Sequence, residues 1–176
     1  MSRHRQIVLY KTAFYSFYLP VALAMYLCRI SHQPSQDPYG IASSILLPLG
    51  VYFQVQDDYL DFAGTPEQIG KVGTDIVDNK CSWCINTALA VATPAQRAVL
   101  DANYGRKDAE AERTVKAIFE EVGIRGKYAA YEEEVYRRIM ELVEVIPESG
   151  LGKEGEVRLQ RVVFKSFLDK IYKRQK

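Results

Sequence analysis

The sequence has almost no net charge. Its 176 residues carry 23 Lys and Arg against 22 Asp and Glu, which gives a formal net charge of +1. Proteins that bind nucleic acids in general carry a marked excess of basic residues, so this balance argues against a nucleic-acid partner. The hydrophobic content of 48% excludes wholesale disorder, and the length predicts one domain over residues 1–176.

Cysteine is also scarce. Cys28, Cys81 and Cys84 are an odd number, and no secretory signal peptide precedes them. We therefore expect a reducing, cytoplasmic setting. Cys81 and Cys84 have the spacing of a CxxC pair, but a zinc site would need two more ligands at suitable spacing. Because the pair falls within a helical pattern, we interpret both residues as packed helix cysteines.

Charged residues are absent from two long stretches, Thr12–Cys28 and Pro38–Gln56. As helices these would be about 25 and 28 Å long, close to the ~30 Å hydrocarbon core of a bilayer. A two-span membrane hairpin is therefore an alternative. Pro20 within the first stretch, and the run into Asp57 after the second, favour buried helices with no membrane insertion.

Helical signals fill the rest of the chain. Thr93–Gln96 has the form of a capping box with proline in the first turn. Apolar residues recur with helical spacing over Val115–Val122 and Tyr128–Ile146. Further helices are expected over residues 74–91 and 157–171. No segment alternates as a strand does, so the sequence predicts an all-α fold.

The sharpest chemical pattern follows the second uncharged stretch. Gln54, Asp57, Asp58 and Asp61 share one face of a helix, which brings three carboxylates and an amide together. Carboxylates so close repel one another unless a cation joins them. An acidic helix N-terminus is the alternative, but this cluster ends an apolar helix, where the dipole disfavours anions. We therefore predict a metal–phosphate site for Mg²⁺, which Mn²⁺ could replace.

Three lysines accompany this pattern in a region with few charges. Lys11 opens the first uncharged stretch, Lys71 follows a glycine turn, and Lys80 comes soon after Asp75. Each would suit a diphosphate as a point charge. Lys71 and Asp75 could instead form an i, i+4 ion pair. Residues 70–74 lack the spacing and the Ser/Thr of a P-loop, so that interpretation is rejected.

Two other features receive no functional role. The run Glu132–Glu134 is interpreted as the solvated face of a helix. His4 and His32 stand apart from the other chemical motifs, and no partner for either can be identified from the sequence.

These motifs resemble the farnesyl diphosphate synthase family across nearly the whole chain. The matching blocks are Tyr10–Pro20, Phe53–Asp61 and Gly70–Trp83, with weaker agreement at Asn103–Gly105 and Lys170–Arg174. The resemblance implies an all-α isoprenoid synthase bundle and Mg²⁺-dependent head-to-tail condensation of isopentenyl diphosphate with dimethylallyl or geranyl diphosphate. It also implies a homodimer, most of whose interface this chain would lack.

The resemblance assigns roles to individual residues. The implied metal ligands are Asp57, Asp58, Asp61 and Asp75. The residues that would bind the allylic diphosphate are Lys11, Lys71 and Lys80. Those that would place oxygen dipoles beside the developing carbocation, or line the substrate tunnel, are Thr12, Gln54 and Tyr15. The basic tail that would close over isopentenyl diphosphate consists of Lys173, Arg174 and Lys176. The direct catalytic roles fall to Lys11, Thr12, Gln54 and Lys80.

One motif of the family is missing. The only aspartate before Asp57 is Asp37, so the sequence has no first aspartate-rich motif. The resemblance thus implies the C-terminal half of the fold, and we expect little condensation activity from this chain alone. A non-catalytic diphosphate-binding protein, or a regulatory partner of a full-length synthase, is the alternative. Half of a helical bundle would leave apolar helix faces exposed to solvent. We expect these faces at residues 14–27 and 41–53.

Overall fold

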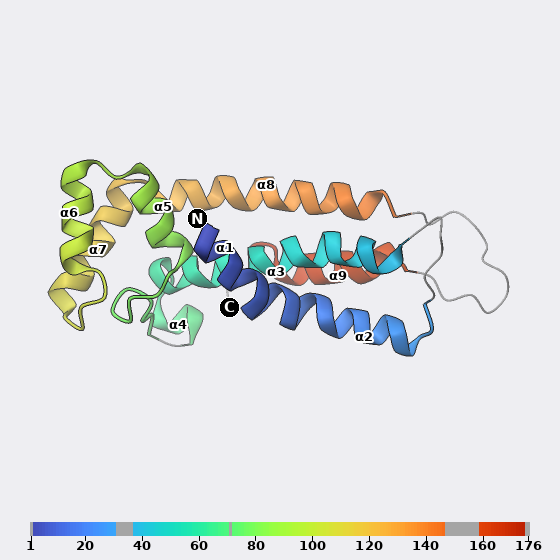
Figure 1. Cartoon of the computed structure of the whole chain (residues 1–176). Helices are drawn as coiled ribbons and strands as arrows, with labels where there is room; N and C mark the ends of the chain where they lie inside the picture. The colour runs from blue at the N-terminus through green and yellow to red at the C-terminus, as the bar shows by residue number, and fades with distance from the viewer. Residues whose placement is uncertain (1, 31–36, 71, 147–158, 175–176) are drawn as a thin grey trace. The chain divides into compact units, whose positions relative to one another are not determined.

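The computed structural model describes residues 2–30, 37–70, 72–146 and 159–174. Within these ranges the chain is helical with no strand, as predicted (Figure 1). The helices are α1 Ser2–Val8, η1 Leu9–Tyr18, α2 Leu19–Leu27, α3 Pro38–Ala63, α4 Pro66–Ile69, α5 Trp83–Val91, α6 Pro94–Asn103, α7 Ala109–Glu121, α8 Ile124–Glu144 and α9 Arg161–Ile171.

The described chain divides into two compact units. Unit 1 contains residues 2–5 and 55–131, and unit 2 contains the described residues of 6–54 and 132–174. Helices α1, α3 and α8 contribute to both units. The single domain expected over residues 1–176 stays a prediction.

In unit 1, α6 and α5 both pack against α7 (Figure 1). The capping box predicted for α6 is present. The Thr93 hydroxyl oxygen accepts the Gln96 N–H at 3.3 Å, and the Gln96 side-chain oxygen accepts the Thr93 N–H at 3.0 Å. Two orphan donors at the helix start are thereby satisfied, which explains why this boundary could be read from four consecutive residues.

The helix expected over residues 74–91 is shorter than predicted, because α5 covers only Trp83–Val91. Residues 75–79 form a turn instead, and backbone groups of residues 74, 75 and 80 bind the side chains of Asp61 and Tyr104. Ser82 then caps α5, with its hydroxyl oxygen accepting a backbone N–H of the first turn at 3.5 Å. Cys81 therefore lies just outside the helix, whereas Cys84 is buried within it.

In unit 2, η1 packs tightly on α3. A Cβ atom at Gly50 would lie 2.5 Å from the Ala13 Cα atom and 2.9 Å from the Phe17 ring. The helix η1 has π geometry, and its end is marked by a hydrogen bond from the Leu19 N–H to the Phe14 carbonyl. Pro20 follows at once and supplies no N–H of its own. Such wide turns are rare and recur at functional sites.

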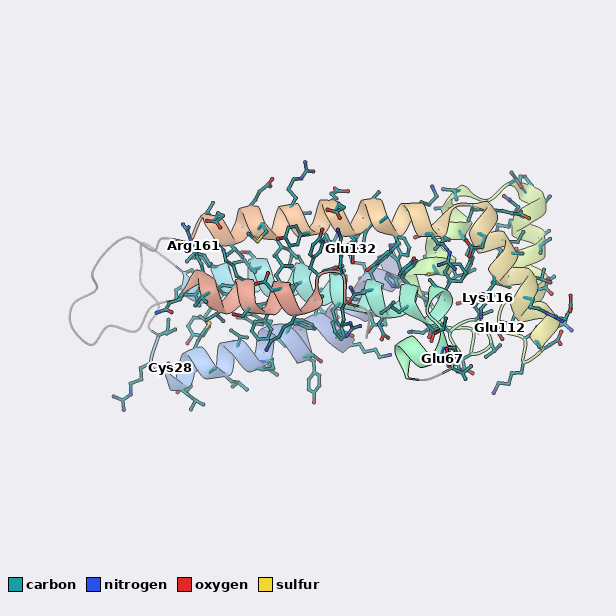
Figure 2. All side chains as sticks on the ribbon, turned by 180° about the vertical axis from the view of Figure 1, so that it is seen from behind. Cys28, Glu67, Glu112, Lys116, Glu132 and Arg161 are labelled. Atoms are coloured by element: carbon teal, nitrogen blue, oxygen red, sulfur yellow. The ribbon has the colours of Figure 1, made fainter. Side chains whose placement is uncertain are left out.

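The core of unit 2 lies along α3 and α9. The fully buried side chains include Ile45, Leu46, Leu49, Tyr52, Phe164 and Leu168. The Tyr52 hydroxyl donates a 2.7 Å hydrogen bond to the Glu132 carboxylate on α8 (Figure 2). Glu132 is only 8% exposed, so the interpretation of Glu132–Glu134 as a wholly solvated face is wrong at its first residue. The tyrosine provides the donor that a buried carboxylate needs.

Two helices are long and apolar enough to cross a bilayer, Arg3–Leu27 and Pro38–Ala63, although the core helices of globular proteins meet the same test. The first is well exposed near its end, where Tyr26 and Leu27 are 74% and 80% exposed. The apolar surface expected at residues 14–27 is therefore present. The surface expected at 41–53 is largely covered, because the inward side chains of α3 are buried within unit 2.

Candidate functional site

The carboxylate of Asp58 is buried in unit 1 and meets three donors. One of its oxygens, Oδ2, accepts the Trp83 N–H at 2.7 Å and lies 3.2 Å from the His4 Nε2 atom. The other, Oδ1, lies 2.9 Å from the Lys80 ammonium. Asp58 is 2% exposed, so these three donors replace water around the buried charge.

Asp61 shapes the loop that follows α4. Its two carboxylate oxygens accept the backbone N–H groups of Thr74 and Asp75, at 3.2 and 2.9 Å. Gly73 lies so close that a Cβ atom there would be 2.2 Å from the Asp61 carbonyl oxygen. Glycine is therefore required at this point for the loop to reach the carboxylate.

Lys80 is held between two carboxylates. Its ammonium lies 2.9 Å from Asp58 and 2.8 Å from Asp75, and 30% of its side chain stays exposed. The Tyr104 hydroxyl fixes the same loop, because it donates to the Lys80 carbonyl at 2.6 Å and approaches the Asp75 carbonyl at 3.2 Å. An ammonium has three donors, so within the described part of the chain Lys80 has one left for a further acceptor.

The side chains of Asp58, Asp61, Asp75 and Lys80, with the groups that bind them, form a cluster in which several pKa values are shifted. Burial raises the pKa of Asp58, but hydrogen bonds from His4 and Lys80, the Lys80 charge and the Trp83 N–H outweigh it and hold that pKa below its usual value. Burial raises the pKa of Asp75 to about 6, since Lys80 only partly offsets it and the charges of Asp61 and Asp58 add to it. Burial lowers the pKa of Lys80, but the Asp58 charge and both ion pairs raise it above normal.

The raised pKa of Asp75 makes stability depend on pH. Native Asp75 keeps its proton up to about pH 6, whereas the unfolded chain loses it near 3.8, so native stability falls as pH rises between these values. Relative to Asp75→Asn, we expect the wild type to lose on the order of 1–2 kcal/mol of unfolding free energy between about pH 4 and about pH 7, less than the full shift because solvent partly screens Asp75. Urea unfolding of both proteins across this range measures it. Parallel stability curves would contradict the assignment.

Unit 2 brings another predicted pair together. The Thr12 hydroxyl on η1 donates a 2.8 Å hydrogen bond to the Gln54 side-chain oxygen on α3. Thr12 is buried, whereas Lys11 and Tyr15 lie on exposed positions of η1, with Tyr15 68% exposed. The hydroxyl and the amide thus form one fixed polar group beside two exposed side chains.

The end of the described chain is attached to α8 and α3 within unit 2. The Lys173 ammonium lies 3.0 Å from the Glu133 carboxylate, which also accepts the Tyr172 hydroxyl at 2.9 Å. The Arg174 guanidinium stacks over the Phe53 ring at 4.3 Å. Lys71 and Lys176, which were assigned to diphosphate binding, lie outside the described residues.

No group of three or more His, Cys, Asp or Glu residues that could hold a metal ion is present in the part of the chain that the structure describes. Asp58 and Asp61 face protein donors, whereas Asp57 is half-exposed. A single carboxylate fits Mg²⁺ when phosphate oxygens and water complete the coordination. The ligand roles of Asp57, Asp58, Asp61 and Asp75 stay predictions.

Sequence reasoning missed three residues of the cluster. His4 was given no role, yet it contacts Asp58, which lies 54 residues further along the chain. Trp83 contributes a backbone N–H, and Tyr104 a hydroxyl, neither of which a side-chain pattern reveals. No local spacing in the sequence links His4 to Asp58, because the two residues lie 54 positions apart.

Comparisons with known proteins agree with this architecture. Residues 1–122 match the polyprenyl synthetase family, and the chain belongs to it. More narrowly, it is 67% identical over 177 residues to the farnesyl pyrophosphate synthase of Ganoderma lucidum, and 53% identical over 176 residues to that of Schizosaccharomyces pombe. Each match covers 100% of this chain, but only 49% and 48% of the relative.

Solved structures give the same result. The farnesyl diphosphate synthase of T. brucei in complex with risedronate superimposes with a TM-score of 0.83 at 38% identity, covering 100% of this chain and 46% of that one. Another complex of that enzyme, with a bisphosphonate, gives 0.84 at 40% identity over 99% of this chain. The isoprenoid synthase fold is thereby confirmed. The chain spans about half the length of the curated relatives it matches.

Proposed function

We propose that the residues of this chain serve the Mg²⁺-dependent head-to-tail condensation of isopentenyl diphosphate with dimethylallyl or geranyl diphosphate. The observation that carries the proposal is the Lys80 ammonium, which Asp58 and Asp75 hold with one donor left over. The identity of 67% to a farnesyl pyrophosphate synthase supports the choice of reaction. The complex of the T. brucei enzyme with a bisphosphonate supports a ligand with two phosphorus groups as the partner of Lys80.

In this proposal the first step is departure of diphosphate from the allylic substrate, which leaves a carbocation. Lys80, together with Lys11 and Lys71, would stabilise the negative charge that develops on the leaving group. The Thr12 hydroxyl and the Gln54 amide would direct fixed oxygen dipoles at the carbocation, and their mutual 2.8 Å hydrogen bond favours a preorganised pair. Tyr15 would line the apolar tunnel that keeps water away.

Mg²⁺ would add positive charge to the leaving diphosphate, with Asp57 as its direct protein ligand. Asp58, Asp61 and Asp75 would support the site through Lys80, the loop backbone and bound water. Isopentenyl diphosphate would be bound by the basic end of the chain, Lys173, Arg174 and Lys176. A homodimer and a cytoplasmic location follow from the family resemblance and stay predictions.

The proposal is tested by titrating the purified chain with inorganic pyrophosphate and Mg²⁺ in a calorimeter. We expect Mg²⁺-dependent binding that Lys80→Ala weakens by about tenfold or more, since a charge-assisted bond to phosphate is lost. Lys116→Ala is the matched control, because Lys116 pairs at 2.6 Å with Glu112 on the surface of α7 (Figure 2). Equal affinities of the two variants, or no binding by the wild type, would contradict the proposal.

A further inference from the structure

His4 is a buried histidine that the proposed reaction does not use. It lies on α1 and is 4% exposed, and its Nε2 atom is 3.2 Å from Asp58 Oδ2. An ionised carboxylate only accepts hydrogen bonds, so the Nε2 atom carries the proton and donates it. A buried imidazole N–H needs such an acceptor, because leaving it unpaired is costly.

The donors around Asp58 are divided between its two oxygens. Oδ2 receives the His4 N–H and the Trp83 N–H, from α1 and α5. Oδ1 lies 2.9 Å from the Lys80 ammonium. Two donors on one oxygen, arriving from separate helices, prevent the carboxylate from rotating and so fix where Oδ1 points.

The position of Oδ1 in turn fixes the ammonium. Lys80 reaches the cluster on a flexible side chain, and its two carboxylate partners are Asp58 and Asp75. The Asp75 end is already fixed through the Asp61 carboxylate, which accepts the Asp75 N–H at 2.9 Å. His4 provides the corresponding support at the Asp58 end.

We propose that His4 is a positioning residue for Lys80: its imidazole N–H orients the Asp58 carboxylate, which aims the ammonium at the diphosphate. The inference rests on the proposed function, because it assumes that Lys80 binds a diphosphate. His4 touches neither substrate nor reacting atoms. Its effect is transmitted through two contacts, His4 to Asp58 and Asp58 to Lys80.

The test uses the full chain and three variants of His4. His4→Gln keeps an N–H donor at similar reach, whereas His4→Phe and His4→Leu fill the space without one. We expect the two donor-free variants to bind inorganic pyrophosphate with Mg²⁺ about tenfold more weakly, and His4→Gln to bind within about threefold of the wild type. Arg5→Ala, an exposed change on the same helix, should bind as the wild type does.

A double-mutant cycle separates positioning from general damage. If His4 acts through Lys80, then His4→Phe should weaken binding no further in a Lys80→Ala background. The inference would be overturned if the losses of binding free energy caused by His4→Phe and by Lys80→Ala were additive. So would donor-free variants that bind pyrophosphate as tightly as the wild type, or a His4→Gln variant that behaves like His4→Phe.

A second measurement does not depend on diphosphate binding. The side-chain ammonium of Lys80 can be followed by nuclear magnetic resonance with nitrogen-labelled lysine, and Lys80→Ala assigns its signal. We expect slow hydrogen exchange of this signal in the wild type and His4→Gln, and fast exchange in both donor-free variants. An unchanged signal would overturn the inference. If the wild type binds no pyrophosphate, the proposed function fails, and this signal alone decides the role of His4.

Discussion

Asp58→Ala is expected to lower the free energy of unfolding by about 3–5 kcal/mol, the usual cost of removing one partner of a buried ion pair. The substitution leaves the Trp83 N–H and the His4 N–H without their acceptor, and Lys80 loses one of its two carboxylate partners. Asp58→Asn keeps one acceptor oxygen, so a smaller loss is expected. Urea unfolding followed by circular dichroism measures both.

Asp78→Ala is the matched control, because Asp78 is an exposed aspartate of the same loop region. Its free energy of unfolding should stay within about 0.5 kcal/mol of the wild type. The explanation would be wrong if Asp58→Ala and Asp78→Ala had similar effects. Such a result would mean that the buried carboxylate adds no more stability than a solvated one.

Gly50→Ala is expected to destabilise the protein by about 1–3 kcal/mol or more, the cost of overpacking a tight contact. In an ordinary helix the same change stabilises, since alanine loses less conformational freedom on folding. At Gly50 the sign reverses, because the added Cβ atom would lie 2.5 Å from the Ala13 Cα atom of η1. A backbone atom cannot rotate away, so the two helices must separate.

Gly126→Ala provides the comparison within α8, where a Cβ atom would meet nothing within 4 Å. This variant should gain about 0.5–1 kcal/mol. Thermal or urea unfolding of both variants tests this, because the free energy of unfolding should fall for Gly50→Ala and rise for Gly126→Ala. A gain for Gly50→Ala would show that η1 and α3 do not approach as closely as described.

The parts of the fold that could be predicted from the sequence are those with local causes. The start of α6 depends on Thr93 and Gln96, three residues apart, and it was predicted correctly. The start of α5 could not be located, because the turns before it depend on Asp61 and Tyr104. These side chains bind Asp75 from 14 and 29 residues away.

The site divides in the same way. One-face spacing on a single helix sufficed to group Asp57, Asp58 and Asp61. The spacing could not show that Asp58 and Asp61 face protein donors, because those donors come from α1, α5 and the loop after α4. The pairing of Thr12 with Gln54 spans 42 residues, and only the family resemblance placed the two residues in one site.

The Tyr104 hydroxyl also has a consequence for the order in which the protein takes shape on the ribosome. It binds the carbonyls of Asp75 and Lys80, which are translated 29 and 24 residues earlier. Folding during synthesis proceeds from the N-terminal side as residues emerge. The backbone of the loop that carries Lys80 is therefore fixed only after the end of α6 has been synthesised. His4 and Asp58 both precede Tyr104 in the chain, so their contact does not require the end of α6.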